Sequence, residues 1–137
     1  MQRNLKFRTF DLDTNKMTYW NLQDLIKSED HLGLDKTNWE LMMCTGLKDM
    51  NNKDIYEGDF IKLMDLDGDT YVVLCEFGIA RKRMMSHFLY EIPSFYFLNF
   101  DKFKSFPCAE MPNGEPMEEK MEVIGNKYEN VDLKICQ

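Results

Sequence analysis

Short runs of aromatic and β-branched residues, separated by asparagine, aspartate and glycine, constrain the fold of this chain most strongly. The sequence contains only two alanines, Ala80 and Ala109. Alanine is the best helix former, whereas aromatic and β-branched side chains favour strands. The chain is therefore predicted to be mainly β, in the α+β class, and a helical bundle is disfavoured.

Two pairs of these runs are each joined by turn residues and predict β-hairpins. Runs 5–10 and 17–20 flank a polar segment, and runs 60–64 and 70–77 flank an acidic segment that contains a glycine. Extended runs on either side of a turn-rich stretch are typical of antiparallel pairing. We expect one hairpin near the N-terminus and a second near the middle of the chain.

Two further runs are expected to be strands. The aromatic run 95–100 is apolar without alternation, which suits a central strand covered on both faces. The run 122–128 contains Gly125, where a bulge or a close backbone approach would fit. Between these runs, three of the four prolines fall within residues 104–120, which predicts a surface loop.

One short helix is expected between residues 21 and 30. Leu22, Leu25 and Ile26 fall at positions i, i+3 and i+4, and Asn21 precedes them as an N-cap. The polar residues that follow are expected to connect this helix to the next strand. The sequence therefore predicts an N-terminal subregion over 1–38, with a hairpin and a helix, and a β-rich, barrel-like subregion over 39–137.

The length and charge of the chain narrow its class. A chain of 137 residues predicts a single domain, 1–137. Seventeen Lys plus Arg against 24 Asp plus Glu give a net charge of −7, which disfavours general coating of nucleic acid. No apolar run has the length of a membrane-spanning helix, and the first residues lack a signal-peptide core. We expect a cytoplasmic protein with no membrane partner.

The cysteines predict neither a metal site nor disulfides. They lie about thirty residues apart with no C-x-x-C pair: Cys44, Cys75, Cys108 and Cys136. Only two histidines, His31 and His87, are available to join them. Reduced thiols packed as small hydrophobic groups are therefore expected, with no metal and no cofactor.

Residues 56–61 form the most distinctive local motif, Tyr-Glu-Gly-Asp-Phe-Ile. Gly58 permits a positive φ and Asp59 can accept hydrogen bonds from nearby backbone N–H groups, so a sharp turn into a strand explains the motif. The alternative is an interaction site, in which Tyr56 is a rigid contact and Glu57 and Asp59 are exposed acceptors for a basic partner.

An acidic segment matches part of the spacing of a calcium loop. Asp65, Asp67, Asp69 and Glu76 stand at positions 1, 3, 5 and 12. The glycine required at position six is absent, since Thr70 stands there, and the flanking runs are strand-like. An acidic hairpin tip is favoured over an ion site.

The only basic run is Arg81-Lys82-Arg83, close to the aromatic strand. A basic groove beside aromatic rings is typical of single-strand nucleic-acid binding, so this run is a second candidate interaction site. A solvated loop or an edge strand explains the same cations and is favoured. His87 stands at no recognisable motif spacing from a serine, cysteine or carboxylate, and no nucleotide-binding or hydrolase motif occurs.

The order of several segments resembles the YopX family of phage and prophage proteins. The segments are KFR at 6–8, TGLKD at 45–49, IYEGD at 55–59 and EVIGNKYEN at 122–130. Phe10 stands where the family often has tryptophan, and Asn52 where a turn glycine is usual. The resemblance implies a phage or prophage origin, homo-oligomers and a C-terminal half similar to a small SH3-like barrel. It implies no activity, cofactor or catalytic residue.

The predicted function is a non-enzymatic, self-associating module that engages an unidentified protein partner in the cytoplasm of the bacterial host. Eleven methionines, including the pairs Met42-Met43 and Met84-Met85, supply either adaptable apolar surface or core filling. The alternative is a nucleic-acid-binding accessory protein in phage replication or transcription, which the basic run would serve. An enzyme is disfavoured because no catalytic constellation is visible.

Overall fold

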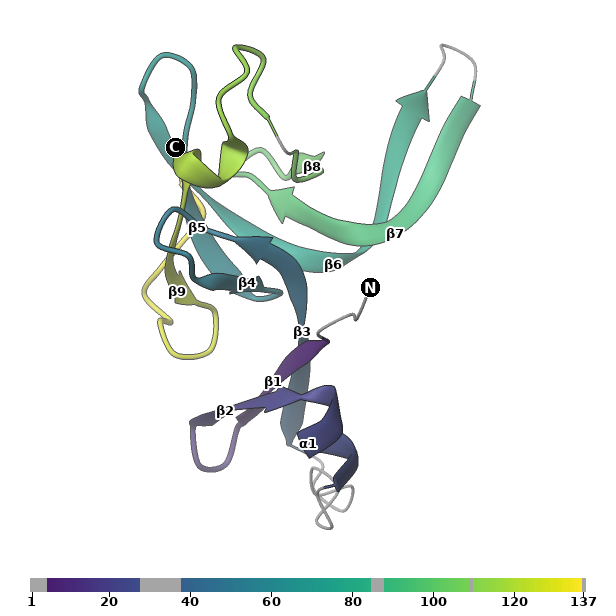
Figure 1. Ribbon diagram of the computed structural model, residues 1–137, viewed down its shortest axis with the longest axis vertical. Coiled ribbons are helices and arrows are strands. Elements are labelled where there is room, and N and C mark those ends of the chain that lie inside the picture. The colour runs from purple at the N-terminus through teal and green to yellow at the C-terminus, as the bar shows by residue number, and fades with distance from the viewer. Residues whose placement is uncertain (1–4, 28–37, 85–87, 109, 137) are drawn as a thin grey trace.

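The computed structural model describes residues 5–27, 38–84, 88–108 and 110–136. Within these ranges the chain forms two antiparallel sheets and one short α-helix (Figure 1). The prediction of a mainly β chain with a small helical part is therefore confirmed. None of the helices in these ranges is long and apolar enough to cross a membrane.

The first sheet contains four strands in the order β2-β1-β3-β4. They are β1 (Lys6–Asp11), β2 (Lys16–Asn21), β3 (Trp39–Lys48) and β4 (Asp54–Tyr56). Strands β1 and β2 form the first predicted hairpin, and Asn15 closes its turn with a φ of 56°. Strand β3 pairs with the other edge of β1, so β1 lies between two neighbours.

One α-helix, α1 (Leu22–Lys27), follows β2 directly. Asn21 caps it, because the side-chain Oδ1 accepts the backbone N–H of Asp24 at 2.7 Å. The predicted helix and its N-cap are confirmed as far as Lys27. Residues 28–30 of the predicted helix, and the polar connection after it up to residue 37, lie outside the described residues.

The second sheet contains five strands in the order β8-β7-β6-β5-β9. They are β5 (Asp59–Met64), β6 (Thr70–Met84), β7 (Phe88–Leu98), β8 (Lys104–Ser105) and β9 (Met121–Asn126). A 3₁₀ helix, η1 (Met117–Lys120), leads into β9. Strands β5 and β6 form the second predicted hairpin, with Gly68 left-handed at its turn (φ 85°).

Strand β9 carries the bulge predicted at Gly125. The register between β5 and β9 shifts between Phe60 and Ile61, which leaves an extra residue in β9. A Cβ at Gly125 would lie 2.5 Å from Cδ1 of Leu133, so a larger residue has no room. The predicted close approach is therefore also confirmed.

The hydrophobic core lies mainly against the second sheet. Its buried members are Ile55, Ile61, Leu63, Val73, Cys75, Phe97, Met117 and Met121. Met117 belongs to residues 104–120, which the prolines predicted to be a surface loop. The prediction is wrong for this side chain, because η1 turns Met117 into the core.

Two expectations about the second sheet differ from the structure. Among the described residues no pairing joins β8 to β9, so the sheet is open and an SH3-like barrel is not confirmed. The aromatic run 95–100 supplies the end of β7, and it is covered on both faces at Tyr96 and Phe97. It is not the central strand, because β6 takes that place and β7 has only the two-residue β8 outside it.

Strands β6 and β7 extend beyond the other strands as a bent, two-stranded projection (Figure 1). Strand β5 pairs with β6 only up to Leu74, and β8 pairs with β7 only at Phe97 and Leu98. We call residues 77–84 of β6 and 88–95 of β7 the arm. Within the part of the chain that the structure describes, the two strands of the arm pair only with each other.

Candidate functional site

The turn between β4 and β5, residues 56–59, connects the two sheets. We call this turn and Arg8 of β1 the joint. Gly58 takes a φ of +89°, a left-handed conformation in which glycine is unstrained. The Oδ2 atom of Asp59 accepts the backbone N–H of Tyr56 at 2.8 Å. The sequence motif therefore folds as the predicted sharp turn into a strand.

Arg8 crosses from the first sheet to fill this turn. Its Nη2 atom lies 2.7 Å from Oδ1 of Asp59 and donates to the carbonyl of Glu57 at 3.1 Å. Its guanidinium also lies 4.8 Å from the centroid of the Tyr56 ring. Burial raises the pKa of Asp59, while Arg8 and the Tyr56 N–H act to lower it. The joint is a buried ion pair whose donors and acceptors are used within the chain.

The joint does not provide the exposed acceptors of the alternative interpretation. Tyr56 and Asp59 are buried, and burial raises the pKa of Tyr56 to about 12. Glu57 is half-buried, and its Oε1 accepts the backbone N–H of Met43 at 2.9 Å. The alternative's expectation of an exposed acceptor is wrong for Asp59, because packing of the two sheets covers the turn, and the same packing leaves the Tyr56 ring little surface for a partner.

The acidic segment forms a hairpin tip, as favoured. Oδ1 of Asp65 accepts the backbone N–H groups of Asp67 and Asp69, both at 2.9 Å, so it closes the β5–β6 turn. The three carboxylates have oxygens within 4.8 Å of one another. Glu76 does not join them and instead accepts a hydrogen bond from the Tyr96 hydroxyl at 3.1 Å. The fourth ligand of the calcium-loop spacing is therefore used elsewhere.

The arm carries an unusual share of exposed apolar side chains. Five of them are at least 44% exposed: Phe77, Ile79, Phe88, Leu89 and Tyr90. Phe77, Ile79 and Leu89 lie on one face of the two-stranded ladder, whereas Phe88 and Tyr90 lie on the other, because neighbouring strand residues alternate. Exposed apolar side chains thus lie on both faces of the arm, and the face with Phe77, Ile79 and Leu89 also carries Arg81, Arg83 and Glu91.

The basic run lies on the arm, near its end. Arg81 and Arg83 are exposed, and Arg81 pairs with Glu91 across the ladder at 3.1 Å. The backbone of Lys82 continues the strand, but its side chain lies outside the described residues. The run is in a paired strand rather than a loop, and among the described residues its other edge carries no strand partner.

A hollow of about 520 Å³ lies where the arm meets the β7–β8 turn, and we call it the basic hollow. It is lined by Ile79, Arg81, Lys102, Phe103, Lys104, Ser105 and Phe106. The turn is shaped by Asn99, whose Oδ1 accepts the backbone N–H groups of Asp101 and Phe103, both at 2.9 Å. Three cations and two phenylalanines from separate segments therefore meet in one place.

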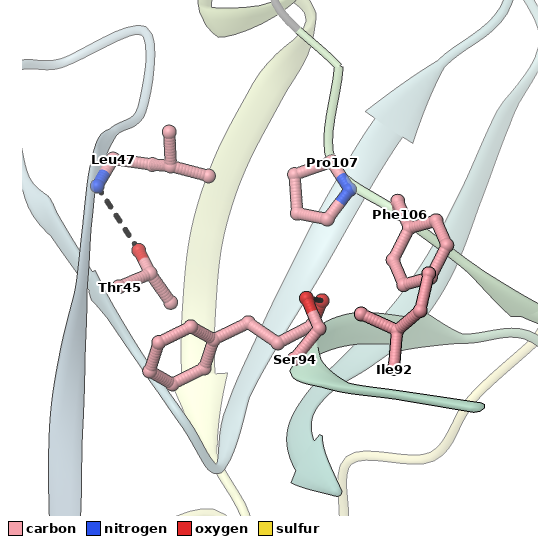
Figure 2. A pocket seen from close by; sticks show the side chains of 7 residues that line it. Thr45, Leu47, Ile92, Ser94, Phe106 and Pro107 are labelled. Atoms are coloured by element: carbon pink, nitrogen blue, oxygen red, sulfur yellow. Dashed lines mark hydrogen bonds between the residues drawn. The ribbon is translucent and has the colours of Figure 1, made fainter. Parts of the chain in front are cut away.

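A second hollow of about 430 Å³ lies between β3 and the arm, and we call it the apolar cleft. Its lining is Thr45, Leu47, Ile92, Ser94, Phe95, Phe106 and Pro107. Figure 2 shows Thr45 and Leu47 on one side, where the Leu47 N–H donates to Oγ1 of Thr45 at 3.0 Å. Ile92, Ser94, Phe106 and Pro107 lie opposite (Figure 2). Phe106 thus lines both the cleft and the basic hollow.

The sequence prediction of the basic site missed Lys102, Phe103 and Lys104. Their segment alternates lysine and phenylalanine in Lys-Phe-Lys-Ser-Phe, which is a recognisable signal for an exposed basic and aromatic surface. No spacing in the sequence links this segment to Arg81, because the contact depends on how the arm bends. The structure supplies that link through Lys104, whose Nζ donates to the carbonyl of Ile79 at 3.2 Å.

The remaining candidate residues have structural positions or lie outside the described residues. The four cysteines are free. Cys75 is packed in the core as expected, and burial raises the pKa of its thiol. The expectation of packed thiols is wrong for Cys108 and Cys136, which are exposed in the C-terminal segments. Met42 is buried, and its Sδ lies 3.4 Å from Nε of Arg8, so it fills the core rather than the surface. Outside the described residues lie His31, His87 and Met85, and the side chain of Met84.

Comparisons with known proteins support the family and the fold. A family model described as "YopX protein" matches residues 6–133. The curated proteins contain no match. Among solved structures, the chain is similar to the crystal structure of protein EF1440 from Enterococcus faecalis, with a TM-score of 0.52 and 17% sequence identity. The similarity covers 96% of this chain and 98% of that chain, so the two share a fold over almost their whole length.

Proposed function

Because the chain belongs to the YopX family, we propose that it is a self-associating protein-interaction module without enzymatic activity. The observation that carries this proposal is the arm, which projects from the second sheet with apolar side chains exposed on both faces. Large exposed apolar patches on folded proteins are typical of surfaces that bind another protein.

The energetics of the arm favour a covered state. An isolated two-stranded hairpin is at best marginally stable in water. Covering a large apolar side chain completely contributes about 1.5–3 kcal/mol, and the arm exposes five such side chains. A partner that covers even part of this surface stabilises both the arm and the complex.

The partner that we propose first is a second copy of the chain. Each copy presents the same apolar arm, and a self-complementary contact between two identical patches closes under twofold symmetry. The apolar cleft at the base of the arm offers further apolar surface for the same contact. A host or phage protein with an apolar surface would use the same residues.

The test is light scattering on a size-exclusion column in reducing buffer. The full chain is expected to form a defined multimer, while the variant Phe88→Ser/Tyr90→Ser is expected to shift toward the monomer. Both residues are exposed, so the substitutions leave the core intact. Because the contact is apolar, raising the salt concentration should leave the wild-type multimer unchanged.

A matched control uses exposed apolar residues far from the arm in sequence. Leu66 and Val131 are 54% and 77% exposed, and Leu66→Ser/Val131→Ser should keep the multimer. A wild-type monomer at every concentration from micromolar to sub-millimolar would overturn self-association. A multimer that survives the arm substitutions would place the interface elsewhere.

The same proposal covers origin and architecture. The family resemblance of the sequence supports a phage or prophage origin, which the genes that flank this one would test. The antiparallel order of β5, β6, β7 and β9 supports a likeness of the C-terminal half to an SH3-like barrel. Both remain proposals beside the self-association of the arm.

A further inference from the structure

We propose that the basic hollow binds a single strand of nucleic acid, a function separate from self-association through the apolar arm. The hollow has a volume of about 520 Å³ and is formed by the arm and the β7–β8 turn. The argument depends on three properties of this hollow: its charge, the availability of its cations and an exposed aromatic ring.

The hollow is basic on an acidic chain. Among the residues that the structure describes, its lining contains Arg81, Lys102 and Lys104 and no carboxylate. The whole chain has 17 cationic and 24 anionic residues, so the rest of it carries 14 − 24 = −10. The three cations therefore stand out from a negative surface, and an anionic ligand is directed to this place rather than to the chain in general.

The cations remain available to a ligand. Within the described ranges, the carboxylate that pairs with a lining residue is Glu91, which contacts Arg81, and the two side chains are 69% and 59% exposed, Arg81 first. Ion pairs this exposed contribute little to stability because water screens them, so a phosphate can replace the carboxylate at little cost. Lys104 lines the hollow, and its Nζ donates to the Ile79 carbonyl and lies 4.7 Å from the centroid of the Tyr96 ring. An ammonium group has three donors, so a phosphate can still accept from it.

An aromatic ring accompanies these charges. Phe103 lies between Lys102 and Lys104 in sequence and is 65% exposed, the largest fraction for an aromatic side chain in the described ranges. The Asn99-centred turn holds its backbone in place. A base can stack on this ring while the phosphates on either side contact the lysines, and such stacking is the usual way to bind single strands without sequence readout.

A polymer fits this surface better than a free nucleotide or a duplex. Arg83 lies two residues beyond Arg81 on the same face of β6, about 7 Å further along the strand, so the cations continue outside the hollow. A free nucleotide would leave Arg83 unused. In a duplex the bases are stacked inside, where Phe103 has no access to their faces.

The experiment measures anisotropy of a labelled thymidylate oligonucleotide of about 12 nucleotides, which is within the site sizes of known single-strand binders. The logarithm of affinity should fall against the logarithm of salt concentration with a slope between about −2 and −3, from three or four phosphate contacts. The variant Arg81→Gln/Lys102→Gln/Lys104→Gln should reduce the magnitude of this slope by about 2.

The ring is tested separately. Phe103→Leu should weaken binding about tenfold with the slope unchanged, since it removes stacking and no charge. A matched charge control is Lys16→Gln/Lys62→Gln/Lys134→Gln, which removes three exposed cations elsewhere and should keep the wild-type affinity within about twofold. All variants should retain the multimer, because none of these residues is among the exposed apolar side chains of the arm.

Three results would overturn the proposal. The first is no binding by the wild type at low salt. The second is an equal loss of affinity in the variant that neutralises the hollow and in the control variant that neutralises three lysines elsewhere. This result would indicate a general charge effect. The third is competition by polyglutamate as strong as by unlabelled oligonucleotide, with no effect of Phe103→Leu, which would indicate a site for acidic protein segments.

Discussion

Two arginines in the described part of the chain form ion pairs with carboxylates, one in the joint and one on the arm. The Arg8–Asp59 pair has an N–O distance of 2.7 Å with both side chains at most 3% exposed. The Arg81–Glu91 pair has a distance of 3.1 Å with both side chains more than half exposed. The two ion pairs have the same chemical groups, but water reaches the pair on the arm and is excluded from the pair in the joint.

The difference shows where function can reside in this molecule. In the joint, Arg8 also contacts the Glu57 carbonyl and the Tyr56 ring, so a ligand would have to displace several buried contacts. On the arm, one exposed carboxylate holds Arg81 and water competes with it. The joint connects two sheets, and the arm presents surface to a partner.

The largest effect that we predict comes from the joint. Arg8→Gln leaves Asp59 buried without its cation and should lower the free energy of unfolding by about 3–5 kcal/mol. The physical reason is desolvation, since the carboxylate must either stay charged in an apolar site or take up a proton. Urea unfolding at neutral pH, followed by circular dichroism, measures the loss.

The arm provides the control for this prediction. Arg81→Gln removes the same chemical group from an exposed pair and should change the free energy of unfolding by less than about 1 kcal/mol. Equal losses of stability from Arg8→Gln and Arg81→Gln would show that burial does not determine how much each ion pair contributes to stability. An Arg8→Gln loss below about 1 kcal/mol would contradict the structural role of the joint.

The joint and the arm also differ in whether their backbone needs a glycine. Gly58 in the joint has a φ of +89°, and a Cβ there would lie 3.1 Å from Sδ of Met42. Gly58→Ala should therefore cost about 1–3 kcal/mol through backbone strain. Gly78 on the arm has no positive φ, and a Cβ there would lie 3.3 Å from the hydroxyl oxygen of Tyr96.

Gly78→Ala is the matched comparison, and it should change stability by no more than about 0.5 kcal/mol. The substitution requires a shift of the Tyr96 hydroxyl by only a few tenths of an ångström, and no left-handed backbone conformation is involved. Thermal unfolding of both variants distinguishes the two cases. Equal destabilisation would show that the arm is packed as tightly as the joint, and this would weaken the proposal that the arm is free to bind.

Local features of the fold followed from local sequence rules. The Asn21 cap, the turn at Gly58 and the bulge at Gly125 each depend on residues a few positions apart, and residue type alone indicated them. The arm did not follow from such rules. The residue pattern predicted strands only at 70–77 and 95–100, which are parts of β6 and β7. No local rule states that the two strands continue past their neighbours.

The candidate site shows the same limit. Arg8 and Asp59 are far apart in the chain, as are Arg81 and Phe103, and no periodicity places either pair together. From residue type alone, Asp59 is predicted to be a turn residue or an exposed acceptor, and Arg81 is predicted to lie in a solvated segment or a nucleic-acid site. Sheet packing and the bend of the arm decide that one is buried and the other exposed, and both are long-range properties.

A third ion-pair site, at Asp54, lies between the two regions in exposure and sharpens the comparison. Its carboxylate is 23% exposed and contacts Lys48 at 2.7 Å and Lys6 at 2.9 Å. Burial acts to raise the pKa of Asp54, but the hydrogen bonds from Lys48 and Lys6 outweigh it and the pKa is lowered. A carboxyl group with a lowered pKa in the folded state stabilises the protein above its unfolded pKa of about 3.9, and this contribution is lost as the pH falls through the folded value.

Asp54→Asn should therefore lower the free energy of unfolding by about 1 kcal/mol at pH 7, less than Arg8→Gln because water screens the pair. As the pH falls below about 3.9 the difference between the variant and the wild type should close, since the wild-type carboxyl group also becomes neutral. Urea unfolding of both proteins across this pH range provides the measurement. A difference that stays constant with pH would mean that the substitution acts through packing, and Asp54 would then belong with the buried contacts of the joint rather than between joint and arm.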